Sequence, residues 1–157
     1  MLENYKKHVA ERAEQNIPPL PLDADQTSEL IELLKKDHQE SDFLLNLLKE
    51  RVPAGVDQAA YVKAAFLADI TTGKASSPYI TKIDAVKILG TMLGGYNIQP
   101  LIECLKDNEL AEAAAHVLSR TLLIFDAFNE IFELSKTNEH AKKVVEEWAN
   151  ATWFTEK

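Results

Sequence analysis

Cysteine is nearly absent from this chain, since Cys104 is the only one among 157 residues. A single thiol cannot form an internal disulfide bond, which excludes a secreted domain held together by disulfides. One cysteine also cannot supply the several thiolates that bind an iron–sulfur cluster. Because Cys104 lies beside the apolar face of Leu101 and Leu105, we expect it to pack as a small, partly buried hydrophobic side chain.

Positive charge is scarce and long hydrophobic runs are missing. The chain has 17 Lys and Arg residues against 25 Asp and Glu residues, so its formal net charge is −8. This balance disfavours sequence-independent binding to nucleic-acid phosphates or to an anionic membrane surface. No apolar run approaches the roughly 20 residues of a membrane helix, and residues 1–10 lack the apolar segment of a secretory signal. We therefore expect a cytoplasmic protein with no membrane partner.

The alternation of apolar and polar residues that is typical of β-strands is also missing. Apolar residues recur at helical spacing instead, which predicts an all-α fold of about seven or eight helices. At roughly 150 residues per domain, the chain is expected to form a single domain, residues 1–157. We expect residues 23–154 to be its helical core. Residues 1–22 are expected to form an N-terminal helix and a proline-rich connector that lies over an apolar surface.

Several predicted helix boundaries carry capping signals. The spacing of a capping box occurs twice, and other residues of the types that begin or end helices stand between the apolar segments. The predicted N-caps are Asp23 (with Gln26), Ser41, Asp57 and Thr81 (with Asp84), and Gly73 is predicted to end a helix. Apolar residues from Leu110 to Phe125 trace one stripe, which predicts a single long helix that residues 128–134 extend.

Residues 83–122 have the rhythm of a HEAT-like repeat. A helix ends at Gly90, a glycine-rich turn leads to a second helix over residues 98–106, and Asp107 precedes a run of small residues. Because small side chains let helices approach closely, we interpret the chain as a compact HEAT-like helical-repeat domain, with residues 41–73 as a second, weaker unit. A plain multi-helix bundle is the alternative.

The chain contains no familiar catalytic or metal-binding motif. No two histidines have the spacing of a helical zinc or di-iron site; the four are His8, His38, His116 and His140. A charge ladder of Glu112, His116 and Arg120 shares one helical face, and we interpret it as solvated. We therefore expect no catalytic residue, no metal and no cofactor in this chain alone.

Two places form the candidate interaction surface. The first is the turn of Gly94, Gly95, Tyr96 and Asn97, which lacks the Lys and Ser or Thr of a phosphate-binding loop. The second is the pair Trp153 and Phe154, large aromatic residues near the C-terminus that need something to cover them. Each place also has a plainer interpretation, in which the turn only joins two helices and the aromatic pair folds back onto its own domain.

Six segments, in order along nearly the whole chain, resemble the N-terminal HEAT-like domain of the bacterial aconitase B family. They are residues 2–12 (LENYKKHVAER), 43–48 (FLLNLL), 51–57 (RVPAGVD), 60–64 (AYVKA), 89–98 (LGTMLGGYNI) and 148–154 (WANATWF). The resemblance implies a HEAT-like domain of a bifunctional aconitate hydratase and 2-methylisocitrate dehydratase. That family interconverts citrate and isocitrate in the tricarboxylic acid cycle on a 4Fe–4S cluster.

The resemblance also implies where the chemistry lies. In this family the cluster cysteines and catalytic residues belong to later domains, so none of them maps onto this sequence. The HEAT-like domain packs against the catalytic domains, and the family links it with self-association and with RNA binding. The net charge of −8 gives the RNA role no support.

Two functions remain open from the sequence. The first is a non-catalytic protein-interaction domain that partners the catalytic domains of an aconitase-B-type lyase. The second is a free-standing helical-repeat adaptor that binds a protein partner or RNA.

Overall fold

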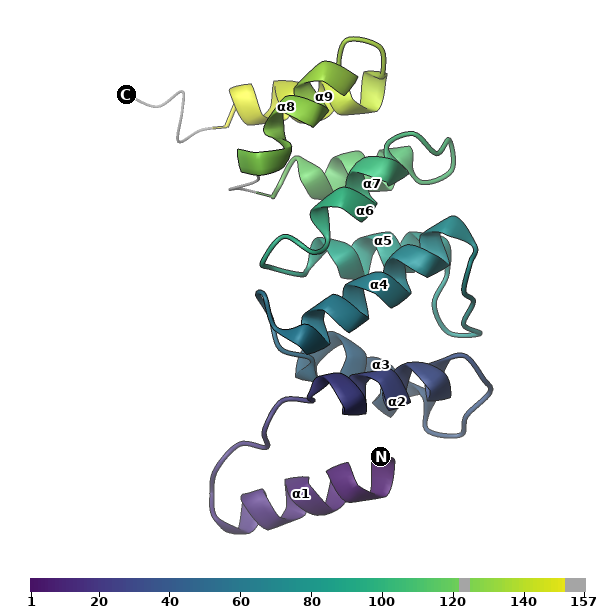
Figure 1. The fold of residues 1–157 in the computed structure, drawn as a ribbon, viewed down its shortest axis with the longest axis vertical. Coiled ribbons are helices and arrows are strands. Elements are labelled where there is room, and N and C mark those ends of the chain that lie inside the picture. The colour runs from purple at the N-terminus through teal and green to yellow at the C-terminus, as the bar shows by residue number, and fades with distance from the viewer. Residues whose placement is uncertain (122–124, 152–157) are drawn as a thin grey trace.

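The computed structural model describes residues 1–121 and 125–151, and Figure 1 shows their arrangement. Over these residues the chain forms nine α-helices, one short π-helical turn and no β-strand. A single antiparallel bridge joins Ser77 and Ile80. The predicted all-α class is confirmed.

The helices follow one another with short connections. Their bounds are α1 (Leu2–Glu14), α2 (Ala24–Leu34), α3 (Ser41–Asn46), the π-turn η1 (Leu47–Arg51), α4 (Gln58–Thr72), α5 (Lys82–Gly90), α6 (Ile98–Cys104), α7 (Ala111–Leu118), α8 (Phe125–Leu134) and α9 (Glu139–Ala149).

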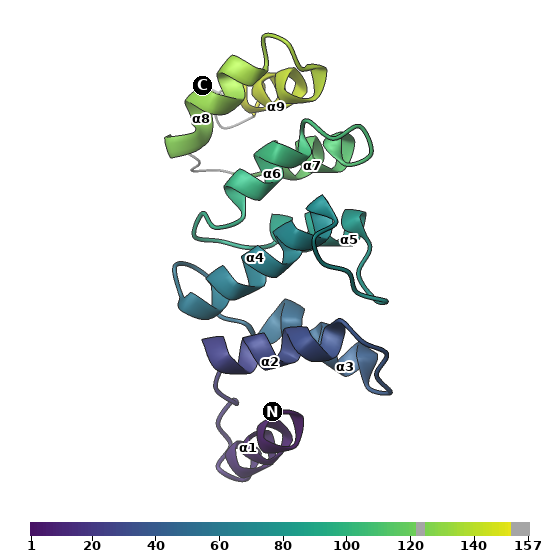
Figure 2. The ribbon, with the colours of Figure 1, turned by 45° about the vertical axis from the view of Figure 1, so that its right-hand side comes forward.

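After α1, the helices form hairpin pairs that stack along one axis. The pairs are α2 with α3, α4 with α5, α6 with α7, and α8 with α9, as Figures 1 and 2 show. Equivalent helices of successive pairs also touch, since α5 contacts α7, α7 contacts α9, and α2 contacts α4. The architecture is therefore a helical-repeat stack of two layers.

The pairing differs from one sequence expectation. Residues 41–73 do not form a repeat unit, because α3 pairs with the preceding helix and α4 pairs with the following one. The expected unit over residues 83–122 likewise begins with the second helix of one pair and continues through the whole next pair. Helical periodicity alone does not decide which neighbour a helix joins.

Local capping explains most helix boundaries. Both capping boxes form as predicted, at Asp23 with Gln26 and at Thr81 with Asp84. Asp57 caps α4 through the backbone N–H of Ala59, and Gly73 ends α4 with a φ of 76°. Ser41 was a wrong prediction by one position: it is the first helical residue, and the preceding Glu40 occupies the N-cap without a side-chain hydrogen bond.

The single long helix predicted from residue 110 does not form. Helix α7 ends at Leu118, and residues 122–124 lie outside the described part of the chain. The Thr121 hydroxyl donates to the Val117 carbonyl at 3.0 Å, and the Trp148 indole donates to the Leu118 carbonyl at 3.1 Å. The same two carbonyls accept the N–H groups of Arg120 and Thr121 three residues on, so α7 closes in a tight turn that the Trp148 indole of α9 contacts.

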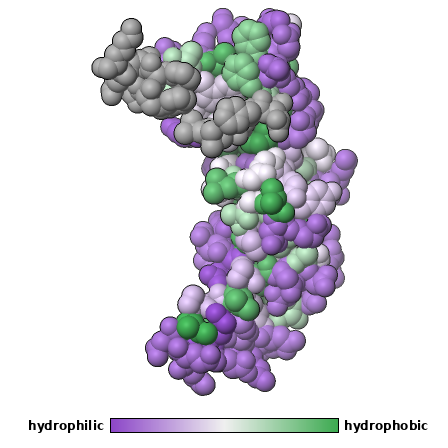
Figure 3. Space-filling model, turned by 60° about the vertical axis from the view of Figure 1, so that its left-hand side comes forward, coloured by the Kyte–Doolittle hydropathy of each residue, from purple (hydrophilic) through white to green (hydrophobic). Residues whose placement is uncertain are grey.

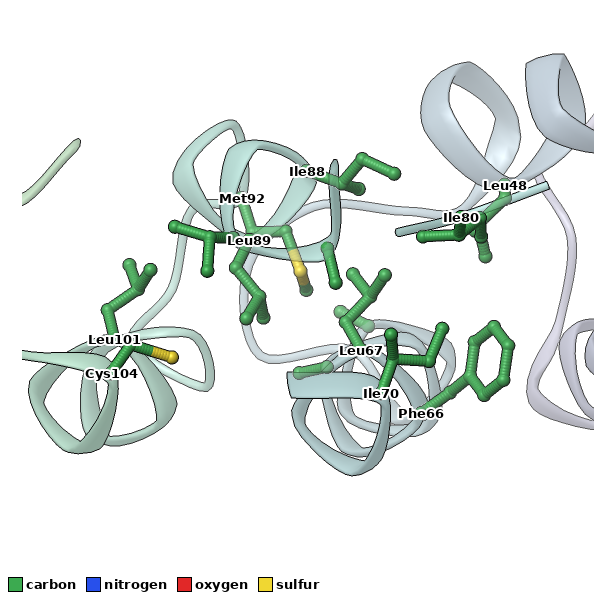
Figure 4. Packing of buried hydrophobic residues seen from close by; sticks show 14 of the residues in the cluster. Leu48, Phe66, Leu67, Ile70, Ile80, Ile88, Leu89, Met92, Leu101 and Cys104 are labelled. Carbon is green, nitrogen blue, oxygen red and sulfur yellow. The ribbon is translucent and has the colours of Figure 1, made fainter. Parts of the chain in front are cut away.

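The core runs through every pair of the stack. It is rich in leucine, and Figure 4 shows Leu89 and Met92 of the α5 end near Leu67 and Ile70 of α4. Cys104 is among the core residues at 4% exposure, and burial raises the pKa of its thiol. Its predicted packing as a small hydrophobic side chain is confirmed.

The proline-rich connector after α1 is held mainly by hydrogen bonds. The guanidinium of Arg51 donates to the Pro19 carbonyl at 2.5 Å and to the Tyr5 hydroxyl at 3.0 Å. Only Leu22 of the connector is fully buried, whereas Leu20 is 54% exposed. The connector is thus pinned by polar contacts and does not lie flat on an apolar surface as expected.

Gly90 lets α5 approach α7 more closely than any side chain would allow. A Cβ atom at this position would lie 2.5 and 2.8 Å from the two methyl groups of Val117. We predict that Gly90→Ala lowers the free energy of unfolding by about 1–3 kcal/mol, the usual cost of overpacking. Chemical denaturation of the chain measures this difference.

Val117→Ala supplies the matched control for that substitution. In the Val117→Ala background the two methyl groups are gone and only the Cβ atom at position 117 stays close, at 3.2 Å, so the loss caused by Gly90→Ala is expected to be much smaller. An equal loss of stability in both backgrounds would contradict the steric explanation.

Candidate interaction surface

The predicted turn after α5 packs its backbone against the loop before α4. Gly94 and Gly95 have φ values of 97° and 98°, which favour glycine. A Cβ atom on Gly94 would lie 2.3 Å from the carbonyl carbon of Gly55, and the Gly55 N–H donates to the Leu93 carbonyl at 3.2 Å. The two loops therefore meet through backbone alone, and Gly94 leaves no room for a side chain.

Asn97 holds this turn from the inside. Its side chain is 1% exposed, and its amide nitrogen donates to the carbonyls of Leu89 at 2.8 Å and Met92 at 3.1 Å. Leu89 lies in the last turn of α5 and its carbonyl also accepts from the Met92 N–H, so the amide adds a second bond there and gives the Met92 carbonyl beyond the helix a buried donor. Of the four residues predicted here, Asn97 supports the surface, and Gly94 and Gly95 are exposed on it.

Tyr96 joins the turn to the neighbouring loop and helix. Its hydroxyl donates to the Val56 carbonyl at 3.3 Å. Its ring meets the Tyr61 ring edge to face, with centroids 5.4 Å apart, a geometry that favours aromatic pairs. The turn, the 52–57 loop and the start of α4 thus form one connected surface.

Large apolar side chains stand exposed on this surface. Val56 is 76% exposed, Leu93 68% and Tyr61 51%, and along the chain before them lie Leu20 and Ile17, at 54% and 38%. We name these five residues the apolar loop edge, because they lie in or beside three connecting segments: the connector before α2, the 52–57 loop and the turn after α5. Figure 3, which brings this side forward, shows hydrophobic groups interrupting a largely hydrophilic surface.

Sequence reasoning missed the apolar loop edge. Val56 follows Gly55 and Leu93 precedes Gly94, and both lie in segments that connect helices. An apolar residue in such a segment is not explained by the apolar face of a helix. That mismatch between residue type and position is the signal that could have found them. Trp153 and Phe154, the other predicted interaction residues, lie outside the described residues.

A second aromatic group lies at the last helix pair. Phe128 stacks on Phe132 with centroids 6.2 Å apart and on Trp148 at 5.9 Å. Both phenylalanines remain 44% exposed, while the Trp148 side chain is partly buried against the core. The contact of Phe128 with Trp148 joins α8 to α9, and the two phenylalanine rings stay partly exposed to solvent.

The described residues do not fit a metal or iron–sulfur centre. Among them no three His, Cys, Asp or Glu side chains gather closely enough to hold a metal ion. Cys104, the single thiol, is buried in the core and its raised pKa disfavours the thiolate that would bind iron.

In the charge ladder, Arg120 contacts the ring of His116 on an exposed face. No helix in the described ranges is long and apolar enough to span a membrane.

The fold and this surface define a helical-repeat domain, and comparison with known proteins identifies its family. Residues 4–154 match the family described as the aconitate B N-terminal domain. Because the match covers almost the whole chain, the chain belongs to this family, and the resemblance found in the sequence is confirmed.

Relatives from several bacteria share this region. The chain is 57% identical over 156 residues to aconitate hydratase B of Escherichia coli, and 54% identical over 160 residues to the protein of the same name from Synechocystis. The aconitate hydratase B of Helicobacter pylori is 48% identical over 158 residues. These matches cover 98–100% of the chain, which spans only 18% of the length of each relative.

Asn97 offers a test of how the turn is held. We predict that Asn97→Ala lowers the free energy of unfolding by about 1–3 kcal/mol, because the Leu89 and Met92 carbonyls lose a buried donor. Asn108→Ala is the matched control: Asn108 is exposed, so a change within about 0.5 kcal/mol is expected. Similar losses for the two variants would show that the buried amide does not support the turn.

Proposed function

We propose that this chain is a non-catalytic docking domain of an aconitate-hydratase-B-type protein. The observation that carries the proposal is the apolar loop edge, exposed on a chain whose relatives continue well beyond the matched region. Exposed apolar side chains that stand together on a well-held surface are typical of interaction sites. The occupant we propose is the catalytic remainder of the same protein.

The shape of the loop edge supports docking. Its loops are held by the contact between Gly55 and Gly94 and by the hydrogen bond from Tyr96, so little conformational entropy is lost when a partner binds. Tyr61 supplies an amphipathic aromatic side chain of the kind enriched at interfaces. Under this proposal citrate–isocitrate chemistry and its iron–sulfur cluster belong to the remainder of a cytoplasmic protein.

A chimera tests the docking. This chain replaces the matching region of the Escherichia coli aconitate hydratase B, and the double variant Val56→Asp, Leu93→Asp is compared with the unmodified chimera. Burying unpaired carboxylates at an interface costs about 3 kcal/mol or more, so docking is expected to weaken about a hundredfold. Limited proteolysis and small-angle X-ray scattering would then show a released domain.

Ile83→Asp is the matched control. Ile83 is also exposed, at 43%, but it lies in the first turn of α5, at the opposite end of that helix from Leu93. It is expected to leave docking unchanged. In the isolated chain, each of these variants should keep the wild-type unfolding midpoint, which separates lost docking from lost folding.

Three results would count against the proposal. Equal release by the loop-edge variant and by Ile83→Asp would remove the loop edge as the contact. Turnover of citrate by the isolated chain would show that it is catalytic. Saturable RNA binding by the isolated chain that weakens steeply between two salt concentrations would favour the alternative adaptor function instead.

A further inference from the structure

Lys63 is a buried lysine without a counter-charge. It lies in the middle of α4 with 4% of its side chain exposed, and it forms no ion pair with a carboxylate of the described residues. Within residues 1–121 and 125–151, its ammonium nitrogen has one hydrogen-bond partner, the Lys49 carbonyl of η1, at 3.4 Å. Buried charges in proteins are normally paired, so this ammonium group lacks the partner that its burial requires.

Lys63 lines a small cavity between η1, α4 and the end of α5. The cavity measures about 70 Å³, and Lys49, Lys63, Pro53 and Thr91 are among its lining residues. Among the residues that the structure describes, no carboxylate lines it. A single water molecule occupies roughly 10–15 Å³ of such a cavity, so this cavity is several times larger than one water requires. The cavity thus has room for a small polyatomic ligand.

Lysines outnumber carboxylates around this cavity and the hollow beside it. A wider hollow of about 410 Å³ adjoins it, shares Lys49 and Thr91, and adds Lys87 together with Glu50 and Asp84. The Asp84 carboxylate accepts from Thr81, and these bonds, followed by Lys87 and Lys49, lower its pKa, so it stays ionised and offsets part of the charge of those two lysines. Glu50 attracts Lys63 only at a distance, and burial outweighs that attraction and lowers the pKa of Lys63 to about 8.

We propose that the cavity of Lys49 and Lys63 binds a small oxyanion of the phosphate or sulfate class. The anion would supply the counter-charge that the Lys63 ammonium lacks, and Lys49, which is exposed, would close the entrance. The Thr91 hydroxyl donates to the Ile88 carbonyl at 2.8 Å, so the ammonium groups are the donors to the ligand. This inference does not rest on the docking proposed above.

Titration with inorganic phosphate tests the site. The 157-residue chain is titrated at pH 7, where Lys63 is mostly protonated, against sodium chloride of equal ionic strength. Calorimetry and amide chemical shifts are expected to show saturable binding with shifts centred on residues 49–54 and 91–93. Lys63→Met should weaken binding by about tenfold or more, the value of one charge-assisted hydrogen bond.

Lys74→Met is the matched control, since Lys74 is an exposed lysine just beyond the far end of α4. This variant is expected to bind phosphate like the wild type. Equal weakening by Lys63→Met and Lys74→Met, or no saturable response in the wild type, would overturn the proposal, because either result means that only diffuse charge acts on phosphate.

A second measurement needs no variant. Carbon-13 NMR of the lysine side chains gives the pKa of Lys63 with and without phosphate. An anion that binds the ammonium form must favour its protonation, so phosphate is expected to raise the pKa of Lys63, and phosphate binding should weaken as pH rises above about 8. An unchanged pKa at a phosphate concentration that saturates the shifts would place the anion elsewhere.

Discussion

The close approach between successive helix pairs is the constraint on which this structure depends. Each pair leaves an apolar side that only the next pair can bury, as in other stacked-repeat proteins. Where neighbouring pairs meet, two glycines remove the side chains that would keep them apart. Gly90 admits Val117 of α7, and Gly94 admits the backbone of Gly55. A side chain at either position would push α5 away from α7, or the turn after α5 away from the 52–57 loop.

Polar side chains then fasten the junctions at the ends of helices. The carbonyl of Leu34 accepts from Ser77, and that of Leu105 accepts from Asn138 at 2.9 Å. Asn97 and Trp148 act in the same way at the ends of α5 and α7. The last carbonyls of a helix are open to donors from elsewhere in the chain, so each of these bonds ties a helix end to the segment that packs beside it.

The same geometry produces the surfaces to which we assign function. Connecting loops that meet through glycine backbone have little space for their own apolar side chains, so Val56 and Leu93 point outward and build the apolar loop edge. The π-turn η1 before the first of these loops places a carbonyl over α4, where it meets Lys63. Docking and anion binding, as proposed, would therefore both arise where η1 and the loop after it meet α4 and the end of α5.

Local structure was predictable from the sequence, because helix periods and caps depend on residues only a few positions apart. The capping boxes at Asp23 and Thr81, the helix end at Gly73 and the buried Cys104 all followed from such patterns. The family was also within reach, since six segments in order carry its resemblance. Tertiary structure alone decided the rest: which helices pair, that Trp148 binds the end of α7, and that Lys63 lines a cavity. Those features depend on contacts between residues far apart in the chain, and no short sequence pattern encodes such distances.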